Sequence, residues 1–164
     1  MCSIILDNYF KTINIALYSD DYSRTEETIY DITGTPKVAP VKSGLGSNLM
    51  NMKAKLKNIN SAGDFCLMIG SDDTPVTKQD YAWTHDIGLT DSGGSVGCTN
   101  RDGNRVFRVT RSYANNTSED IEVKEVGLVF YTRGIKVLIA REVLPEPVVV
   151  KANGGIQAFG IDLF

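Results

Sequence analysis

The sequence predicts a mainly β protein, an antiparallel β-sandwich with one or two short helices and an extended N-terminal region. Strand-like runs recur at intervals of roughly 10 residues in the second half of the chain. Turn residues separate these runs, and no helical pattern lies between them. This spacing is typical of sandwiches and barrels built by antiparallel pairing, with a jelly roll as one candidate arrangement.

The chain is long enough for one compact domain, with 164 residues of which 42% are apolar. We expect residues 65–164 to form the sandwich core and residues 1–64 to form an arm or extra strands that pack on it. Within residues 2–40 the apolar residues fit a helical stripe imperfectly and are also rich in strand formers, so both alternatives stay open. Residues 28–33 are expected to form a short strand, and residues 36–48 an irregular connection rich in Pro, Gly and Ser.

The middle of the chain contains two predicted strands and one predicted helical turn. Residues 51–58 alternate apolar side chains with lysines, which is typical of a half-buried strand at a protected sheet edge. Residues 65–69 are almost wholly apolar and predict a buried strand. Thr77 is placed to cap a helical turn that runs through Trp83, with Asp80 three residues after it.

The second half predicts a short strand around Val96, bracketed by turn signals at residues 91–94 and 101–104. Further strands, each bounded by turn residues, are expected over residues 105–111, 121–131, 136–144, 148–151 and 156–164. Pro145 and Pro147 are expected to interrupt pairing after residue 144, because proline has no N–H to donate.

The charge balance argues against nucleic acid as a partner. Lys and Arg total 17 against 20 Asp and Glu, so the chain lacks the basic field that gathers phosphates. Arginines and aromatic residues do cluster over residues 101–113, as in single-strand binders, but ordinary strand-face arginines are preferred because no basic groove continues elsewhere. The apolar runs are too short to cross a bilayer, and the N-terminus lacks a signal-peptide pattern, so we expect no membrane partner and synthesis in the cytoplasm.

No pattern points to catalysis, a metal or a cofactor, so we expect a protein that is not an enzyme. His85 is the single histidine and has no nucleophile turn beside it. Cys2, Cys66 and Cys98 lack the spacing of a zinc site or a disulfide framework. Adjacent acids such as Asp72 and Asp73 are expected to be solvated turn residues.

Two further motifs resemble binding loops only in part. Residues 44–49 begin like a dinucleotide fingerprint, but Leu49 stands where the third glycine belongs, so we expect a loop. Residues 100–104 have the oxygen side chains of a calcium loop, but Gly103 is one place early and Arg111 replaces the twelfth-position Glu, so we expect a turn.

Several phrases of the sequence resemble a recurrent pattern in virion proteins of tailed bacteriophages, and the likeness covers residues 65–164. They are Val123-Lys124-Glu125-Val126-Gly127-Leu128-Val129-Phe130, Leu138-Ile139-Ala140-Arg141-Glu142-Val143, Pro147-Val148-Val149-Val150 before Gly154-Gly155, residues 68–75, and Asp80-Tyr81-Ala82. The chain departs from the pattern at Trp83-Thr84 and at residues 151–153. In a sheet, Gly127 leaves room for a large cross-strand neighbour, and Glu125 and Arg141 can pair across adjacent strands. The alternative for that pair is two solvent-facing charges that contribute little.

The resemblance implies a structural protein of a tailed phage particle, present in many copies as a head decoration, neck, collar or tail component. Its partners would be other virion proteins and further copies of itself, and its location would be the virion. We expect Tyr81 and Trp83 to anchor subunit contacts, and the loop that contains Gly44 and Gly46 to contact neighbours. Core packing of both aromatic rings is the equal alternative. A carbohydrate- or ligand-binding sandwich module is the alternative function.

Overall fold

The structure is a computed structural model that describes residues 4–9, 11, 27–39, 65–83, 87–101, 103–132 and 135–163. Its strands are β1 (Ile4–Ile5), β2 (Glu27–Tyr30), β3 (Pro36–Ala39), β4 (Phe65–Gly70), β5 (Thr90–Arg101), β6 (Asn104–Asn115), β7 (Ile121–Thr132), β8 (Ile135–Val150) and β9 (Gly155–Leu163). Residues 7–9 and 11 are helical. The predicted mainly β, antiparallel architecture is therefore confirmed.

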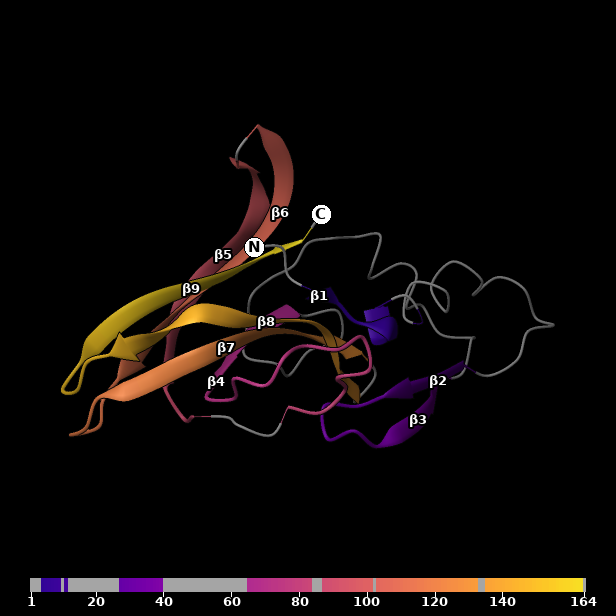
Figure 1. Cartoon of the computed structure of the whole chain (residues 1–164), viewed down its shortest axis with the longest axis horizontal. Coiled ribbons are helices and arrows are strands. Elements are labelled where there is room, and N and C mark those ends of the chain that lie inside the picture. Colours follow the sequence, from indigo (N-terminus) through magenta and orange to yellow (C-terminus); the bar gives the residue numbers. More distant parts are fainter. Residues whose placement is uncertain are drawn as a thin grey trace.

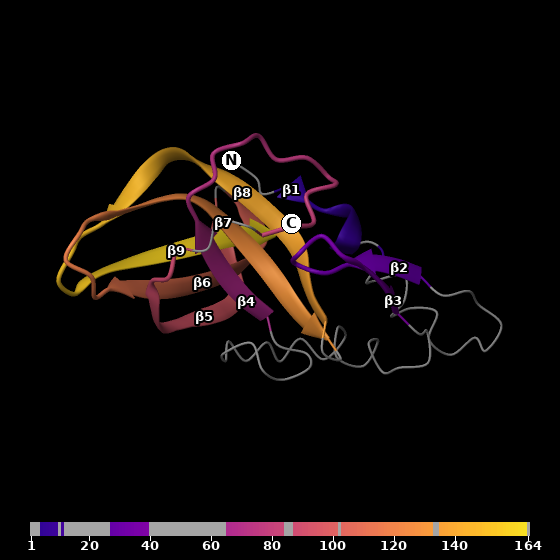
Figure 2. The same ribbon diagram turned by 90° about the horizontal axis from the view of Figure 1, so that it is seen from below.

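The strands form two larger sheets and one hairpin, all with antiparallel pairing. One sheet has the strand order β1-β8-β7-β4, and the other has the order β5-β6-β9. The hairpin of β2 and β3 is separate from both. Figures 1 and 2 show this hairpin at one end of the molecule, beside the short β1, while β5, β6 and β9 extend toward the opposite end.

One apolar cluster joins the two larger sheets. Alternate residues of β7, such as Val126, Leu128 and Phe130, share this cluster with Val109 of β6 and Ile161 of β9. The remaining buried members come from β2, β4 and β6 to β9, and they are Ile29, Leu67, Ile69, Tyr113, Val123, Val137, Ile139, Ala140, Val150, Phe159 and Leu163. The period of two along β7 is what places every second side chain in this core.

The opposite face of β7 and β8 is also buried, because the N-terminal segment and residues 71–83 lie over it. Leu6 and Trp83 form a second apolar cluster there with Val129 and Leu138. The backbone N–H of Leu6 donates to the carbonyl of Ile139 over 3.0 Å. Burial on both faces explains why residues 125–130 are all buried, including the charged Glu125.

Two predicted interruptions of strands are wrong. The glycines at residues 93 and 94 lie inside β5, where the register shifts between Asp91 and Gly93 as a bulge and Gly93 has a φ of 106°. β8 continues through Pro145 and Pro147, which lie where the β7–β8 register shifts between Val123 and Glu125. No described strand pairs with this stretch of β8 on its other side, so the missing N–H groups cost no ladder bond.

The helical turn predicted from Thr77 to Trp83 is also wrong, since the structure has only a turn at residues 78–79. The backbone there pairs with a distant segment instead: Ala82 forms a bridge with Thr33, and the N–H of Trp83 donates to the carbonyl of Ile32 over 2.7 Å. These bonds hold the backbone extended and prevent helical i→i−4 bonding.

The N-terminal region contributes strands in its described part. Strand β2 confirms the strand expected within residues 28–33, whereas β3 occupies residues 36–39, where an irregular connection was expected. The strand predicted over residues 51–58 lies outside the described residues. The N–H of Ile32 donates to the carbonyl of Lys136 over 2.8 Å, so the loop between β2 and β3 contacts β8.

The β5–β6 hairpin reaches past the end of β9. The last pair between β6 and β9 joins Phe107 to Leu163, whereas β5 and β6 continue to pair as far as Arg101 and Asn104. The end of this hairpin is therefore a two-stranded ribbon among the described strands, and Figure 1 shows it projecting away from the sheets.

Candidate functional site

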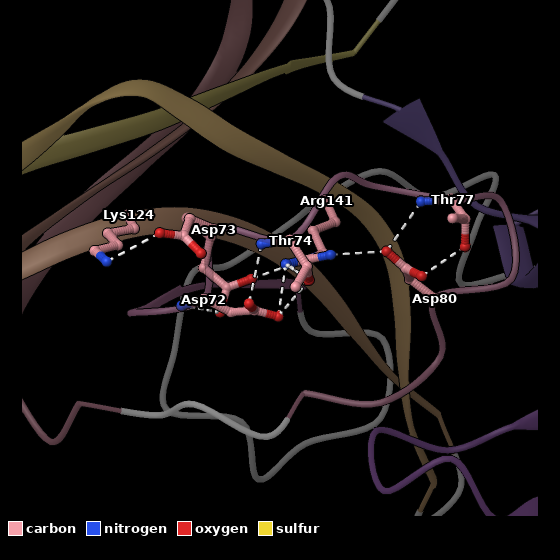
Figure 3. Close-up of polar contacts among 8 residues, drawn as sticks. Asp72, Asp73, Thr74, Thr77, Asp80, Lys124 and Arg141 are labelled. Carbon is pink, nitrogen blue, oxygen red and sulfur yellow. Dashed lines mark hydrogen bonds and ion pairs between the residues drawn. The ribbon is translucent and has the colours of Figure 1, made fainter.

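A buried arginine on β8 is the centre of the most extensive polar cluster in the described residues. The Arg141 side chain is 5% exposed, and its Nε donates to Glu125 Oε2 over 2.7 Å. Its Nη1 donates to Asp80 Oδ2 over 2.8 Å, and its Nη2 donates to Asp72 Oδ2 over 3.1 Å (Figure 3). One guanidinium thus joins β7, β8 and the two halves of the segment over residues 71–83.

Each aspartate also organises its own turn. Asp72 accepts hydrogen bonds from the backbone N–H of Thr74 over 3.0 Å and from its hydroxyl over 2.8 Å. Asp80 accepts the corresponding bonds from Thr77 over 3.0 and 2.6 Å. Such Asp and Thr turns are local, so the sequence forms them without long-range help. The carboxylates are then oriented before they meet Arg141.

The ionisation of the cluster follows from burial and from these bonds. Burial raises the pKa of Glu125, and the hydrogen bond and charge of Arg141 oppose that rise without cancelling it. Burial also acts to raise the pKa of Asp80, but the hydrogen bonds from Thr77 and Arg141 outweigh it and the pKa of Asp80 is lowered. Nearby, Lys124 Nζ donates to Asp73 at the surface over 3.0 Å (Figure 3).

A pocket of about 360 Å³ opens beside this cluster. Its lining residues are Gly34, Asp72, Thr74, Gln79, Asp80, Tyr81, Ala82, Trp83, Glu125 and Arg141. The Tyr81 ring is half buried and stacks on Tyr30 with centroids 4.3 Å apart. The pocket therefore combines an aromatic wall with polar side chains, a combination that small polar ligands use in proteins.

Trp83 occupies the space above Gly127. A Cβ at residue 127 would overlap Cζ3 of the Trp83 ring and lie 2.8 Å from its Cε3, so only glycine admits the ring at this distance. Trp83 is 8% exposed, and its buried Nε1 has no hydrogen-bond partner among the residues that the structure describes. The sequence predicts a large cross-strand neighbour for Gly127, and the residue opposite it on β8 is Arg141. The ring that fills the space above Gly127 is instead that of Trp83, which comes from outside the sheet.

The arrangement can fix a loop and bind a polar ligand. Asp72, Asp80 and Glu125 all accept hydrogen bonds from Arg141, and the two aspartates also accept from threonines, so none of these three carboxylates is positioned as an isolated base. Within the described ranges, no group of three or more His, Cys, Asp or Glu side chains is arranged to hold a metal ion.

The structure brings two of the four predicted interface residues together. Tyr81 and Trp83 line the same pocket, with Tyr81 half buried and Trp83 in the second apolar cluster. Gly44 and Gly46 lie outside the described residues, as does His85. The interface role of all four stays a prediction.

Sequence reasoning predicted the Glu125–Arg141 pair, which is confirmed, but missed Asp72 and Asp80 as further partners. Asp72 was expected to be a solvated turn residue, yet it also binds Arg141. A signal was present, because a charged residue inside the apolar run over residues 137–141 needs buried counter-charges. The sequence alone does not show which of its acids supply them.

Two arginines of β6, Arg108 and Arg111, form ion pairs with aspartates of neighbouring strands. Arg108 donates from Nε and Nη2 to the two oxygens of Asp162, both over 2.6 Å. The buried Arg111 donates to both oxygens of Asp91. The contacts of these two arginines fit the strand-face interpretation preferred from the sequence.

The described residues contain no helix with the length and apolarity that a membrane span requires. Comparison of the chain with protein-family models, with curated proteins and with solved structures finds no match.

Proposed function

We propose that this chain is a structural subunit of a tailed-phage particle that assembles in many copies at the head, neck, collar or tail. One observation carries the proposal: residues of the phage-like pattern that are far apart in sequence meet in one buried cluster. Asp72 and Arg141 are 69 residues apart and form an ion pair, and Glu125 binds the same guanidinium. Asp80, from the Asp80-Tyr81-Ala82 phrase, accepts from the same guanidinium over 2.8 Å.

The contacts give the resemblance a physical basis. Glu125, Asp72 and Asp80 are suited to their positions because each accepts a hydrogen bond from Arg141. These residues work as a unit that ties the segment over residues 71–83 to the sheet. Matching segments that contact one another support a shared architecture with phage virion proteins better than isolated sequence matches do.

The proposal is tested on particles purified from cells that carry and express the gene. We expect mass spectrometry to find the chain in the particle fraction at a constant ratio to the coat protein across independent preparations. Recovery of the chain only in the particle-free fraction, while coat protein sediments normally, contradicts the proposal.

Variants of Tyr81 test the predicted interface separately. Tyr81 is half buried and stacks on Tyr30, so Tyr81→Ala removes its ring without opening the apolar core. We expect a tagged Tyr81→Ala chain to fold and to enter particles less efficiently than the tagged wild type. Trp83→Ala is the companion variant: if it folds and enters particles normally, Trp83 is not an anchor.

The pocket beside Arg141 favours a second candidate function, a carbohydrate- or ligand-binding module. The stacked Tyr81 ring, the Gln79 amide and the carboxylates are the groups that hold sugar rings in proteins. A glycan-binding screen of the purified chain, with Tyr81→Ala as control, tests it. Binding that Tyr81→Ala abolishes, in a chain absent from particles, favours this candidate over the first.

A further inference from the structure

Most sheet edges in the described structure carry a feature that prevents pairing with another chain. The open stretch of β8 contains Pro145 and Pro147, which have no N–H to donate. The β5 edge contains the bulge between Asp91 and Gly93, and the regular stretch after the bulge includes Gly93, Gly94 and Gly97, which weaken strand pairing. β1 is only two residues long.

The remaining edges outside β9 are covered or short. β4 is buried, and the carbonyl of Leu67 accepts a hydrogen bond from the Tyr113 hydroxyl. The backbone N–H and carbonyl of Tyr30 in β2 are both bound by the side chain of Asn8, over 3.0 and 2.8 Å. β3 is four residues long and begins with Pro36 and Lys37.

Strand β9 is the exception among the described strands. It is nine residues long, pairs with β6 in an unbroken register, and pairs with no described strand on its other side. It contains no Pro, Lys or bulge. The amide of the exposed Gln157 donates to the carbonyl of Ala158 over 3.2 Å, a contact that the end of a flexible side chain can exchange for a backbone donor of another strand. Ile156 is 65% exposed, and Gln157, Ala158 and Gly160 are also exposed. A long regular edge of this kind is a template for a further strand.

We propose that β9 pairs antiparallel with β9 of a second copy of this chain, which joins two three-stranded sheets into one continuous sheet. This contact makes a second copy of the chain the partner in the multi-copy assembly of the proposed function. In that respect the proposed contact rests on the proposed function. Backbone hydrogen bonds supply the affinity in this mode of association.

The sequence of β9 is compatible with pairing to itself. A two-fold axis at Ala158 places Ile156 opposite Gly160 of the second copy, so that the exposed β-branched side chain covers a residue without one. The same register keeps core-facing residues on one side of both strands, because opposed residues differ by an even number. Asp162 is the only charged residue of β9, and Arg108 binds it, so pairing opposes no like charges.

The test is the mass of the purified full-length chain in solution, measured by light scattering after size exclusion over a wide range of concentration. We expect the wild type to have twice the chain mass of 18.0 kDa, and Ala158→Lys to have the single-chain mass. Ala158→Glu should also be monomeric, because each variant opposes like charges at the axis. An equimolar mixture of the two variants should recover the doubled mass, because Lys then opposes Glu.

Val149→Lys is the matched control, since Val149 is an exposed apolar residue on β8 of the other sheet. We expect it to keep the doubled mass, and circular dichroism should show the same strand content in every variant. A wild type of 18.0 kDa at all concentrations overturns the β9 contact, as does a doubled mass in Ala158→Lys. Either result leaves the particle assignment to be judged by mass spectrometry of particles, so the two failures are distinguishable.

Discussion

Arg141 Nε lies 2.7 Å from Glu125 Oε2, although the β7–β8 register pairs Arg141 with Gly127 and Glu125 with Val143. The ion pair is therefore diagonal across the two strands, and both residues are buried, with 4% and 2% exposure. Residues directly opposed in an antiparallel pair lie on the same face of the sheet, so Arg141 lies on the face of Gly127. Glu125 and the Trp83 ring above Gly127 lie on this face too.

Arg141→Met should destabilise the fold far more than Glu125→Gln. Loss of the guanidinium leaves three carboxylates without their shared cation, and removing one partner from a buried ion pair costs about 3–5 kcal/mol. In Glu125→Gln, Arg141 keeps Asp72 and Asp80. Urea unfolding of both variants measures the difference, and equal losses would mean that Glu125 alone balances Arg141.

Lys124→Met is the control for charge removal in the same region. Lys124 binds the exposed Asp73 at the surface, where ion pairs contribute little. We expect its unfolding midpoint to stay close to that of the wild type, which separates the effect of a buried pair from that of net charge.

Acidification should weaken the fold partly through Asp80. Because the folded pKa of Asp80 is lowered, its stabilising contribution is present above the ordinary aspartate pKa of about 4 and is lost as the pH falls through the lower folded value. Asp80→Asn should therefore lose less stability than the wild type on acidification below that pH. Thermal unfolding of both proteins at a series of pH values measures this difference, and a constant difference in stability across that series would contradict the prediction.

The contribution of Glu125 to the pH dependence of stability should have the opposite sign to that of Asp80. Because its folded pKa is raised, the folded state holds the proton more tightly, and stability falls as the pH rises from the ordinary glutamate range of about 4 to the folded value. Glu125→Gln lacks this loss. The stability difference between variant and wild type should therefore shift in favour of the variant over that interval, in the same series of unfolding curves.

Gly127→Ala should be destabilising because of Trp83. The added methyl group overlaps the indole and lies 3.0 Å from Leu138 Cδ1, and overpacking of this kind costs about 1–3 kcal/mol. In a Trp83→Leu background the cost should be smaller, which a double-mutant cycle detects as coupling.

Asn8→Ala should loosen the β2–β3 hairpin more than the main sheets. The buried Asn8 side chain satisfies both backbone groups of Tyr30, and leaving buried polar groups unsatisfied costs about 1–3 kcal/mol. We expect faster amide hydrogen exchange in residues 27–30 with little change in β7. Gln79→Ala, which removes an exposed hydrogen bond to Asp7, should leave the exchange rates of residues 27–30 and of β7 near those of the wild type. Equal acceleration in β7 would show that Asn8 supports the whole fold.

The strands that bury alternate side chains were predictable from sequence. In β6, Val109, Arg111 and Tyr113 are buried and their neighbours are half exposed, so the period of two appears directly in the residue pattern. The Glu125–Arg141 pair was predictable because opposite charges stand in two apolar strands expected to be neighbours.

The path of residues 71–83 was not predictable, because distant residues determine it. The Thr77–Asp80 hydrogen bonds match a helix cap, yet the chain does not turn into a helix because Trp83 bonds to Ile32 and Asp80 bonds to Arg141. Pro145 is a similar case, since a proline ends a strand only where a neighbour needs its N–H. Both outcomes depend on strand order, which local sequence does not specify.

The overhanging end of the β5–β6 hairpin has a mechanical consequence. Past Phe107, each of the two strands has only the other as a neighbour among the described strands, over about 10 Å at the usual rise of a strand. Ribbons of two strands twist more strongly than wider sheets and have little stability of their own. Bending the hairpin past the end of β9 is therefore expected to cost less than bending the sheets behind it.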